Sequence, residues 1–129
     1  MSGRCPRNGM GAMSVVFDNM HYFVAGLSLT LQLTLISGVI ALLAGLVVTT
    51  MRVSPVPAFR GAAMVYVEII RNTPITIVFF FAAFVLSQIG IRLPYFTFAI
   101  IALSVYYTAF FAEALRSGFN SVAVGQAEA

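Results

Sequence analysis

The sequence contains a stretch from Asn19 to Met51 without one ionised side chain. Two further uncharged stretches run from Asn72 to Ile91 and from Leu93 to Ala112. A helix needs about 20 apolar residues to cross the roughly 30 Å hydrocarbon core of a bilayer, and each stretch is long enough. With 60% hydrophobic and 9% charged residues, the chain has the composition of an all-α membrane protein.

The hydrophobic stretches divide the chain into a polar tail and a membrane domain. Pro55 and Pro57 lack backbone donors, so the connector "MRVSPVPAFR" at 51–60 is predicted to leave the helix. A short turn, "GIRLP", separates the last two hydrophobic regions. The prediction is a tail over 1–20, a transmembrane domain over 21–129, and three spans at about 22–50, 61–89 and 95–115.

Small side chains recur at intervals of four residues in the first span. They are Gly26, Thr30 and Thr34, followed by Ser37, Ala41 and Gly45. Such a stripe lets helix backbones approach closely in lipid, where no hydrophobic force drives helices together. We therefore expect a packing face along this helix.

The segment "EIIRNTPITIVFFFAAFVL" places charged residues directly beside a proline. In one interpretation, Asn72 or Thr73 is an N-cap and Pro74 takes the first helical position of a helix of about 17 residues, with 58–70 as a separate segment at the membrane surface. In the other, one helix runs from about Gly61 to Gln88 and kinks at the proline. In both interpretations, the proline leaves backbone groups near Arg71 without their helical hydrogen bonds.

Two Glu–Arg pairs with the same spacing lie at the edges of these spans. Glu68 and Arg71 are three residues apart and able to pair along one helix, as are Glu113 and Arg116. If the second and third spans are antiparallel, Arg71 also reaches Glu113. Ionisable residues in a span mark a pathway or gate, and the alternative is that these four are interfacial anchors.

Several chemistries have no support in the sequence. The seven cationic residues are all arginine, so no phosphate-binding loop with its lysine is present. The lone His21 and lone Cys5 give neither a metal site nor a nucleophile–base pair, which argues against an enzyme. No basic cluster with interleaved aromatics predicts nucleic-acid binding. With Arg71 set aside, the other six arginines tie at three on each side of the spans, so their charge does not fix orientation. Arg71 lies nearest the connector at 51–60 and tips the count slightly toward that side.

Three segments carry a family resemblance. "GLSLTLQLTLISGVIALLAGLVVTTMRVSP", "YVEIIRNTPITIVFFFAAF" and "ALSVYYTAFFAEALRSGFNSVAVGQAEA" resemble, in this order, permease subunits of bacterial ABC importers for polar amino acids. The combination of G-L-x-x-T-L, E-x-x-R-N-T-P, A-E-x-x-R-S-G and G-Q-x-E-A is specific. "TTMRVSP" and "AEALRSG" are most similar to actinobacterial glutamate systems, which favours glutamate as substrate.

The resemblance implies a plasma-membrane protein with its N-terminus outside and its C-terminus in the cytoplasm. It implies a second permease subunit, two cytoplasmic ATPases that bind the ATP, and an extracytoplasmic amino-acid-binding protein, with no cofactor in this chain itself. The pathway or gating candidates are Glu68, Arg71, Asn72, Thr73, Pro74, Glu113 and Arg116. The cytoplasmic coupling loop would begin within 117–129, at Gly125, Gln126, Glu128 and Ala129.

In the family this loop continues and two further spans follow, so the resemblance implies the N-terminal part of a five-helix permease. Two other functions remain open from the residues alone. A small proton-coupled homodimeric exporter has similar size but carries its acid in the first span, which has none here. A membrane adaptor without transport activity would use the small-residue stripe and would make the charged residues dispensable.

Overall fold

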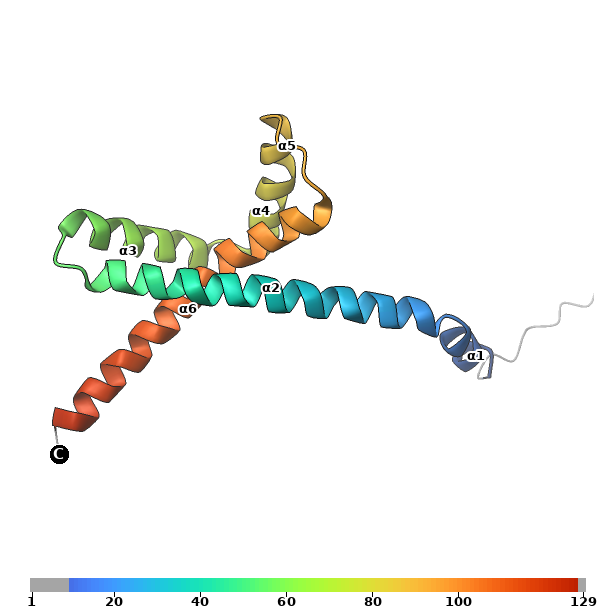
Figure 1. The fold of residues 1–129 in the computed structure, drawn as a ribbon, viewed down its shortest axis with the longest axis horizontal. Coiled ribbons are helices and arrows are strands. Elements are labelled where there is room, and N and C mark those ends of the chain that lie inside the picture. The colour runs from blue at the N-terminus through green and yellow to red at the C-terminus, as the bar shows by residue number, and fades with distance from the viewer. Residues whose placement is uncertain (1–9, 128–129) are drawn as a thin grey trace, which may run out of the picture. The chain divides into compact units, whose positions relative to one another are not determined.

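The computed structural model describes the backbone of residues 10–127 and the side chains of residues 11 and 13–122. All regular structure in this part of the chain is helical, as the sequence predicts. The chain divides into two units, Met1–Gln32 and Leu33–Ala129. Figure 1 labels the helices. The candidate site lies in the second unit.

The first unit holds a short helix and the beginning of a long one. Helix α1 spans Met10–Asp18, and α2 begins at Met20 and runs to Val53. Asn19 separates them, and its backbone amide and its side-chain Nδ2 both donate to the Val15 carbonyl, at 3.2 and 2.8 Å. Asparagine side chains that bond to nearby carbonyls commonly interrupt helices in this way.

Within residues 10–127, two helices are long and apolar enough to cross a membrane. Helix α2 has 34 residues, and α6 spans Tyr95–Ala127 with its apolar window at Tyr95–Val122. A bent pair of helices between them makes a third candidate, so two or three spans fit the length and composition. Helix α6 continues past the predicted end of the third span at about 115, because no proline interrupts 95–127.

The second hydrophobic region is broken at its Thr-Pro step. Helix α3 spans Pro57–Asn72 and α4 spans Ile75–Phe80, and the chain bends by 105° between them. Thr73 is extended, at φ −100 and ψ 130, as expected for a residue before proline. The prediction of a break is therefore confirmed, whereas a continuous kinked helix is wrong.

The predicted cap at this break is also wrong in detail. Pro74 is the N-cap of α4, with φ −60 and ψ 139, and neither Asn72 nor Thr73 caps that helix. Proline fixes φ but leaves ψ free to be extended, so the first helical residue is Ile75. Asn72 and Thr73 instead belong to the end of α3.

The segment after the bend changes its helical form before it ends. A π-helical turn, η1, spans Phe81–Val85 and leads into α5 at Leu86–Gln88. Gly90 then adopts φ 87, and its amide donates to the Ser87 carbonyl at 3.3 Å. The Ile91 amide donates to the Leu86 carbonyl at 3.0 Å. These two bonds form a Schellman motif, which ends the helix at the predicted turn.

Gly90→Ala should destabilise this turn by about 1 kcal/mol, because a left-handed backbone places a Cβ against the following carbonyl. The measurement is the free energy of unfolding of the detergent-solubilised chain. Gly118→Ala is the matched control, since that helical glycine has no positive φ and nothing within 4 Å of an added Cβ. Equal stability of the two variants would contradict the assignment.

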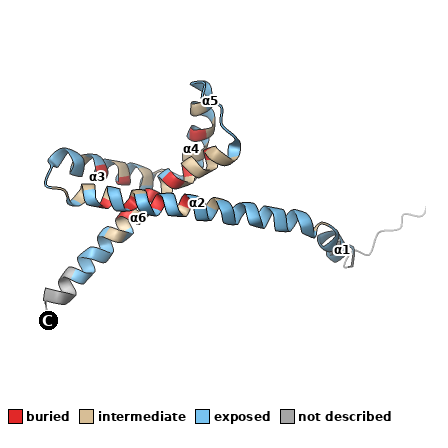
Figure 2. Ribbon diagram, in the orientation of Figure 1, coloured by how far each residue is buried: buried red, intermediate tan, exposed pale blue. Residues whose placement is uncertain are grey.

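The small-residue stripe of α2 is a packing face over its second half. Buried residues of α2 are Ser37, Ala41, Gly45 and Thr49, so the predicted stripe extends one step further than expected. Gly26 and Thr30, which lie in the first unit, and Thr34 in the second are exposed. Figure 2 shows the buried residues gathered where α2, α3 and α6 approach one another.

Helix α3 packs on α6 through one side only. Val67 is 2% exposed and lies in a core cluster with Ala109 and Ala112, and Tyr66 and Ile70 pack against it. The Tyr66 hydroxyl donates to the Val105 carbonyl at 2.5 Å. Helices α2, α3 and α6 thus meet around Ala112 of α6, and the next residue along α6 is Glu113.

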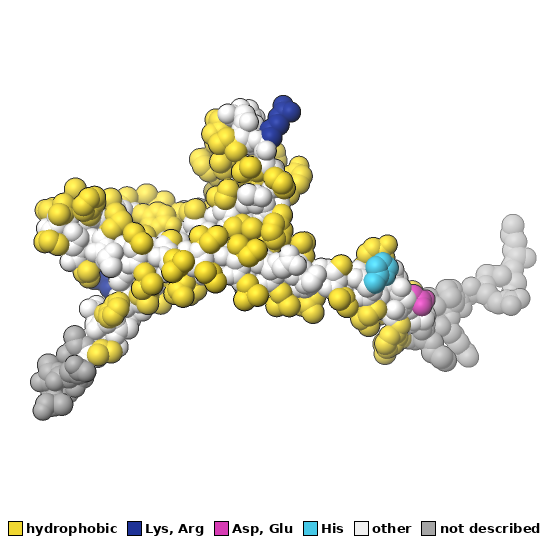
Figure 3. Space-filling model, viewed as in Figure 1, with side chains coloured by type: hydrophobic (Ala, Val, Ile, Leu, Met, Phe, Trp, Pro, Cys, Tyr) yellow, Lys and Arg dark blue, Asp and Glu magenta, His cyan; other side chains and the backbone are white. Residues whose placement is uncertain are grey.

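The outer surface of these helices is largely apolar. Leu35, Val39, Leu43 and Val47 of α2 are all more than half exposed. Figure 3 shows hydrophobic side chains spread over the visible faces of α2 and α3. A soluble monomer rarely exposes so much contiguous apolar surface, whereas lipid or further protein helices cover it in a membrane protein.

Candidate functional site

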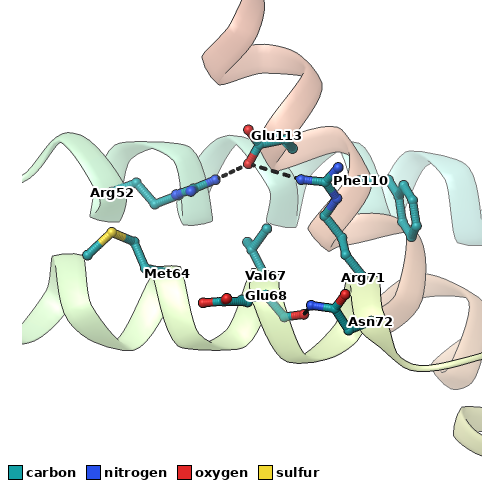
Figure 4. A pocket seen from close by; sticks show the side chains of 8 residues that line it. All are labelled: Arg52, Met64, Val67, Glu68, Arg71, Asn72, Phe110 and Glu113. Atoms are coloured by element: carbon teal, nitrogen blue, oxygen red, sulfur yellow. Dashed lines mark hydrogen bonds and ion pairs between the residues drawn. The ribbon is translucent and has the colours of Figure 1, made fainter.

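One carboxylate, that of Glu113, binds arginines from three helices. Its Oε2 lies 2.5 Å from a terminal nitrogen of Arg52 and 3.7 Å from one of Arg71. Its Oε1 lies 3.6 Å from a terminal nitrogen of Arg116. Arg52 stands in the last turn of α2, Arg71 in the last turn of α3, and Arg116 one turn beyond Glu113 on α6. Figure 4 shows the Arg52 and Arg71 side chains converging on Glu113.

The three contacts are unequal. The Arg52 side chain is 10% exposed and makes a hydrogen bond, whereas Arg71 and Arg116 are each 46% exposed and make longer contacts. Charge-assisted hydrogen bonds between buried partners are the strong ones, and exposed ion pairs contribute about 0–1 kcal/mol. Glu113 is therefore bound mainly to Arg52.

Sequence reasoning missed Arg52, which it placed in the connector. The signal was present, because Arg52 follows Thr49 by three residues and so continues the small-residue stripe that faces α6. Thr49 donates to the Gly45 carbonyl at 2.7 Å and also lies 3.3 Å from the Ala112 carbonyl oxygen. The close approach at Gly45 and Thr49 brings the end of α2 to Glu113. The Arg52 Nε is buried and has no hydrogen-bond partner among the described residues.

The local pairing predicted for Glu68 and Arg71 does not form. Arg71 reaches across to Glu113, which confirms the predicted contact between the second and third hydrophobic regions. Within residues 10–127, Glu68 has no ion pair, although its backbone carbonyl accepts a hydrogen bond from Asn72 Nδ2 at 2.8 Å. The predicted pair of Glu113 and Arg116 is present.

Thr73 explains why a helix can end beside Pro74. Its Oγ1 donates to the Ile69 carbonyl at 2.7 Å, and its amide donates to the Ile70 carbonyl at 3.2 Å. Proline has no N–H to serve these carbonyls, and an unsatisfied carbonyl in lipid costs several kcal/mol. The "NTP" sequence therefore supplies the donors that the break requires.

The charged residues line a cavity of about 510 Å³. Its walls come from α2, α3 and α6 and consist of Arg52, Met64, Val67, Glu68, Arg71, Asn72, Phe110 and Glu113. Figure 4 shows Arg52 and Glu113 across from Met64, Val67 and Glu68. A volume of this size is within the range of roughly 300–1,000 Å³ that small-molecule sites occupy.

The predicted site residues separate into three groups. Glu68, Arg71, Asn72 and Glu113 line the cavity, and Arg116 contacts it through Glu113. Thr73 and Pro74 shape the end of α3 and are not among the lining residues. Of the predicted coupling-loop residues, Gly125 and Gln126 belong to the helical backbone of α6, and Glu128 and Ala129 lie outside the described residues.

Comparison with known proteins identifies close relatives, although no family model matches the sequence. The chain is 40% identical over 112 residues to the glutamate transport system permease protein of Corynebacterium efficiens, covering 78% of this chain and 49% of that protein. It is 36% identical over 117 residues to a probable glutamine ABC transporter permease protein of Bacillus subtilis, covering 91% and 54%.

A solved structure supports the same relationship. The crystal structure of an amino acid ABC transporter with histidines matches with a TM-score of 0.85 and 34% sequence identity. The match covers 90% of this chain and 54% of the chain compared. The chain spans about half the length of the relatives it matches. Sequence and fold together place this all-α chain in the family of polar amino-acid ABC transporter permeases, which are membrane subunits of transporters and not enzymes.

Proposed function

We propose that the chain forms one section of the translocation pathway of an ATP-driven importer for polar amino acids, with glutamate or a related acidic or amide amino acid as substrate. The substrate class is supported by relatives named for glutamate and glutamine transport. The observation that carries the proposal is the cavity in which Glu113 and its arginines gather, beside a broken helix and within otherwise apolar segments. Charges seldom persist at such positions unless they line a polar route.

Family membership supports a division of labour among partners. ATP would bind to a pair of cytoplasmic ATPases, an extracytoplasmic protein would deliver the amino acid, and a second permease subunit would complete the pathway. With the N-terminus outside, the connector at 51–60 and the end of α6 would both face the cytoplasm and the ATPases. Gly125, Gln126, Glu128 and Ala129 would then begin the segment that contacts them.

Arg71→Ala should abolish uptake while leaving membrane insertion intact. In the organism that encodes the chain, its gene is deleted and replaced by the wild type or the variant, and uptake of radiolabelled glutamate and glutamine is measured. We expect uptake to fall by at least tenfold and toward background, because removing Arg71 would deprive a substrate carboxylate in the cavity of a charge-assisted partner worth about 1.5–3 kcal/mol. Immunoblots of the membrane fraction report insertion.

Arg60→Ala is the matched control for this experiment. Arg60 lies on the same helix, is exposed, and is not among the residues that line the cavity. Its variant should transport at the wild-type rate. If Arg71→Ala also transports normally, Arg71 is an interfacial anchor and the adaptor function gains support. If deletion of the gene changes neither glutamate uptake nor glutamine uptake, the proposed function is wrong.

A further inference from the structure

A second cavity lies at the turn that joins α5 to α6. Its volume is about 360 Å³, and its walls come from η1, α5, the turn and the first residues of α6. The lining residues are Ala83, Phe84, Ser87, Arg92, Leu93, Tyr95 and Phe98. None of them lines the cavity around Glu113, so this is a separate site.

The cavity lies between the ends of two apolar segments. The bent pair of helices that forms the third candidate span ends at Gln88, and the apolar window of α6 begins at Tyr95. Arg92 lies between them, and Tyr95 is 86% exposed. Arginine and tyrosine are typical of the boundary between hydrocarbon and water. In a bilayer that these segments cross, the cavity is therefore at the level of the lipid headgroups.

The charge of Arg92 has no counter-ion nearby. The sequence contains no Asp or Glu between Glu68 and Glu113. Within the described part of the chain, Arg92 makes neither an ion pair nor a side-chain hydrogen bond, unlike the three arginines that share the Glu113 carboxylate. All five N–H donors of its guanidinium are thus available to an anion.

The polar groups in this cavity are suited to an anion. No carboxylate lines it, and the Tyr95 hydroxyl makes no hydrogen bond among the described residues, so it is a second available donor. Ser87 already donates its hydroxyl proton to the Ala83 carbonyl at 2.6 Å. Arginine binds phosphate oxygens bidentately, which makes a phosphate the anion that this site fits best.

The rest of the cavity is an apolar wall that is fixed in place. Phe98 is 5% exposed, and the Phe84 ring stacks on that of Phe80 with centroids 4.2 Å apart. Ala83 and Phe84 belong to the π-helical turn η1, a form that is frequent at functional sites. A free inorganic phosphate would leave this wall in water, whereas a phosphate that carries acyl chains would cover it.

We propose that this cavity binds the headgroup of a phospholipid. Arg92 binds the phosphodiester, Tyr95 donates a hydrogen bond to it, and the aromatic wall contacts the glycerol and the first acyl carbons. The inference concerns the lipid around the chain and does not depend on which amino acid is transported. The bound lipid would hold the turn against the beginning of α6.

The test counts lipid molecules that stay bound to the protein. The full chain is purified in detergent, titrated with dioleoyl phosphatidylglycerol, and observed by native mass spectrometry, which gives the dissociation constant of the first bound lipid. Dioleoylglycerol, which has the same acyl chains but no phosphate, should bind roughly tenfold more weakly or less. Inorganic phosphate should not displace the phospholipid.

Two substitutions separate the site from general attraction of lipid to positive charge. Arg92→Gln should raise the dissociation constant roughly tenfold or more, whereas Arg60→Gln, which removes an exposed arginine that does not line the cavity, should leave it unchanged. Ala83→Leu keeps Arg92 but fills the cavity, and it should also weaken binding. Ala58→Leu is its control, because Ala58 is exposed and is not a lining residue.

Circular dichroism of each variant reports whether the helices are intact. Arg92 is exposed, so its variant should keep the wild-type helical content even if Ala83→Leu does not. Equal weakening by Arg92→Gln and Arg60→Gln would overturn the site, as would equal binding of the phospholipid and dioleoylglycerol. Displacement of the lipid by inorganic phosphate would overturn the assignment to a lipid.

Discussion

Glu113→Ala should destabilise the association of α2, α3 and α6 more than any other single loss of charge in the chain. The substitution leaves three arginines without their shared carboxylate. Removing one partner of a buried ion pair costs about 3–5 kcal/mol, whereas exposed pairs contribute about 0–1 kcal/mol. Because Arg52 is 10% and Glu113 29% exposed, we expect an intermediate loss of about 2–3 kcal/mol. The measurement is unfolding of the detergent-solubilised chain.

Glu68→Gln is the matched control for the loss of a carboxylate. Glu68 has no ion pair within residues 10–127, so its neutral variant should change the free energy of unfolding by less than about 0.5 kcal/mol. Glu113→Gln, which keeps the size of the side chain, should behave like Glu113→Ala. A double-mutant cycle with Arg52→Ala should show coupling, because the two residues are in direct contact. Equal effects of Glu113→Gln and Glu68→Gln would contradict the central role of Glu113.

Gly45→Leu should force α2 and α6 apart. Even a Cβ at this position would lie 2.9 Å from Phe111 Cβ and 3.3 Å from the Ala112 backbone nitrogen. Overpacking ordinarily costs about 1–3 kcal/mol, and here one obstacle is backbone that cannot rotate away, so we expect about 3 kcal/mol or more. Displacement of α6 should also separate Arg52 from Glu113. The measurements are the free energy of unfolding and maleimide labelling of a cysteine placed at Ala112.

Gly38→Leu provides the control on the same helix. An added Cβ at Gly38 meets nothing within 4 Å, so this variant should unfold at nearly the wild-type free energy. Ala112 is fully buried, and its cysteine should be labelled slowly in the wild-type and Gly38→Leu backgrounds. Rapid labelling is expected only with Gly45→Leu. Similar labelling in all three backgrounds would show that Gly45 is not a close-contact position.

The fold was predictable from the sequence where uncharged length and small-residue spacing determine it. The uncharged stretches that begin at Asn19 and Leu93 predicted the two long helices. The spacing of Ser37, Ala41 and Gly45 predicted the face through which these helices pack. The break at Pro74 was also predictable, because proline restricts the residue before it. The size of the bend at this break, 105°, was not predictable, since it depends on the ψ angles of Thr73 and Pro74 together.

The candidate site was predictable only in part. Charge within apolar segments pointed to Glu68, Arg71, Glu113 and Arg116, and three of these meet in one cluster. Local spacing favoured pairing of Glu68 with Arg71, but a contact between helices replaced it. Arg52 escaped notice because an arginine after an apolar run is typical of a membrane boundary. Only the position of α6 shows that the Arg52 side chain points toward Glu113 and not toward the membrane boundary.

The four-residue interval between Ser37, Ala41, Gly45 and Thr49 has a geometric consequence for the charged site. At 3.6 residues per turn, each such interval advances about 40° around the helix, so the stripe winds and suits a partner that crosses at a slant. Figure 1 shows α6 crossing α2 in this way. Two straight rods that cross obliquely touch at one place and diverge beyond it. Beyond the close contact at Gly45 and Ala112, the long side chains of Arg52 and Glu113 therefore join α2 to α6, and both line the cavity.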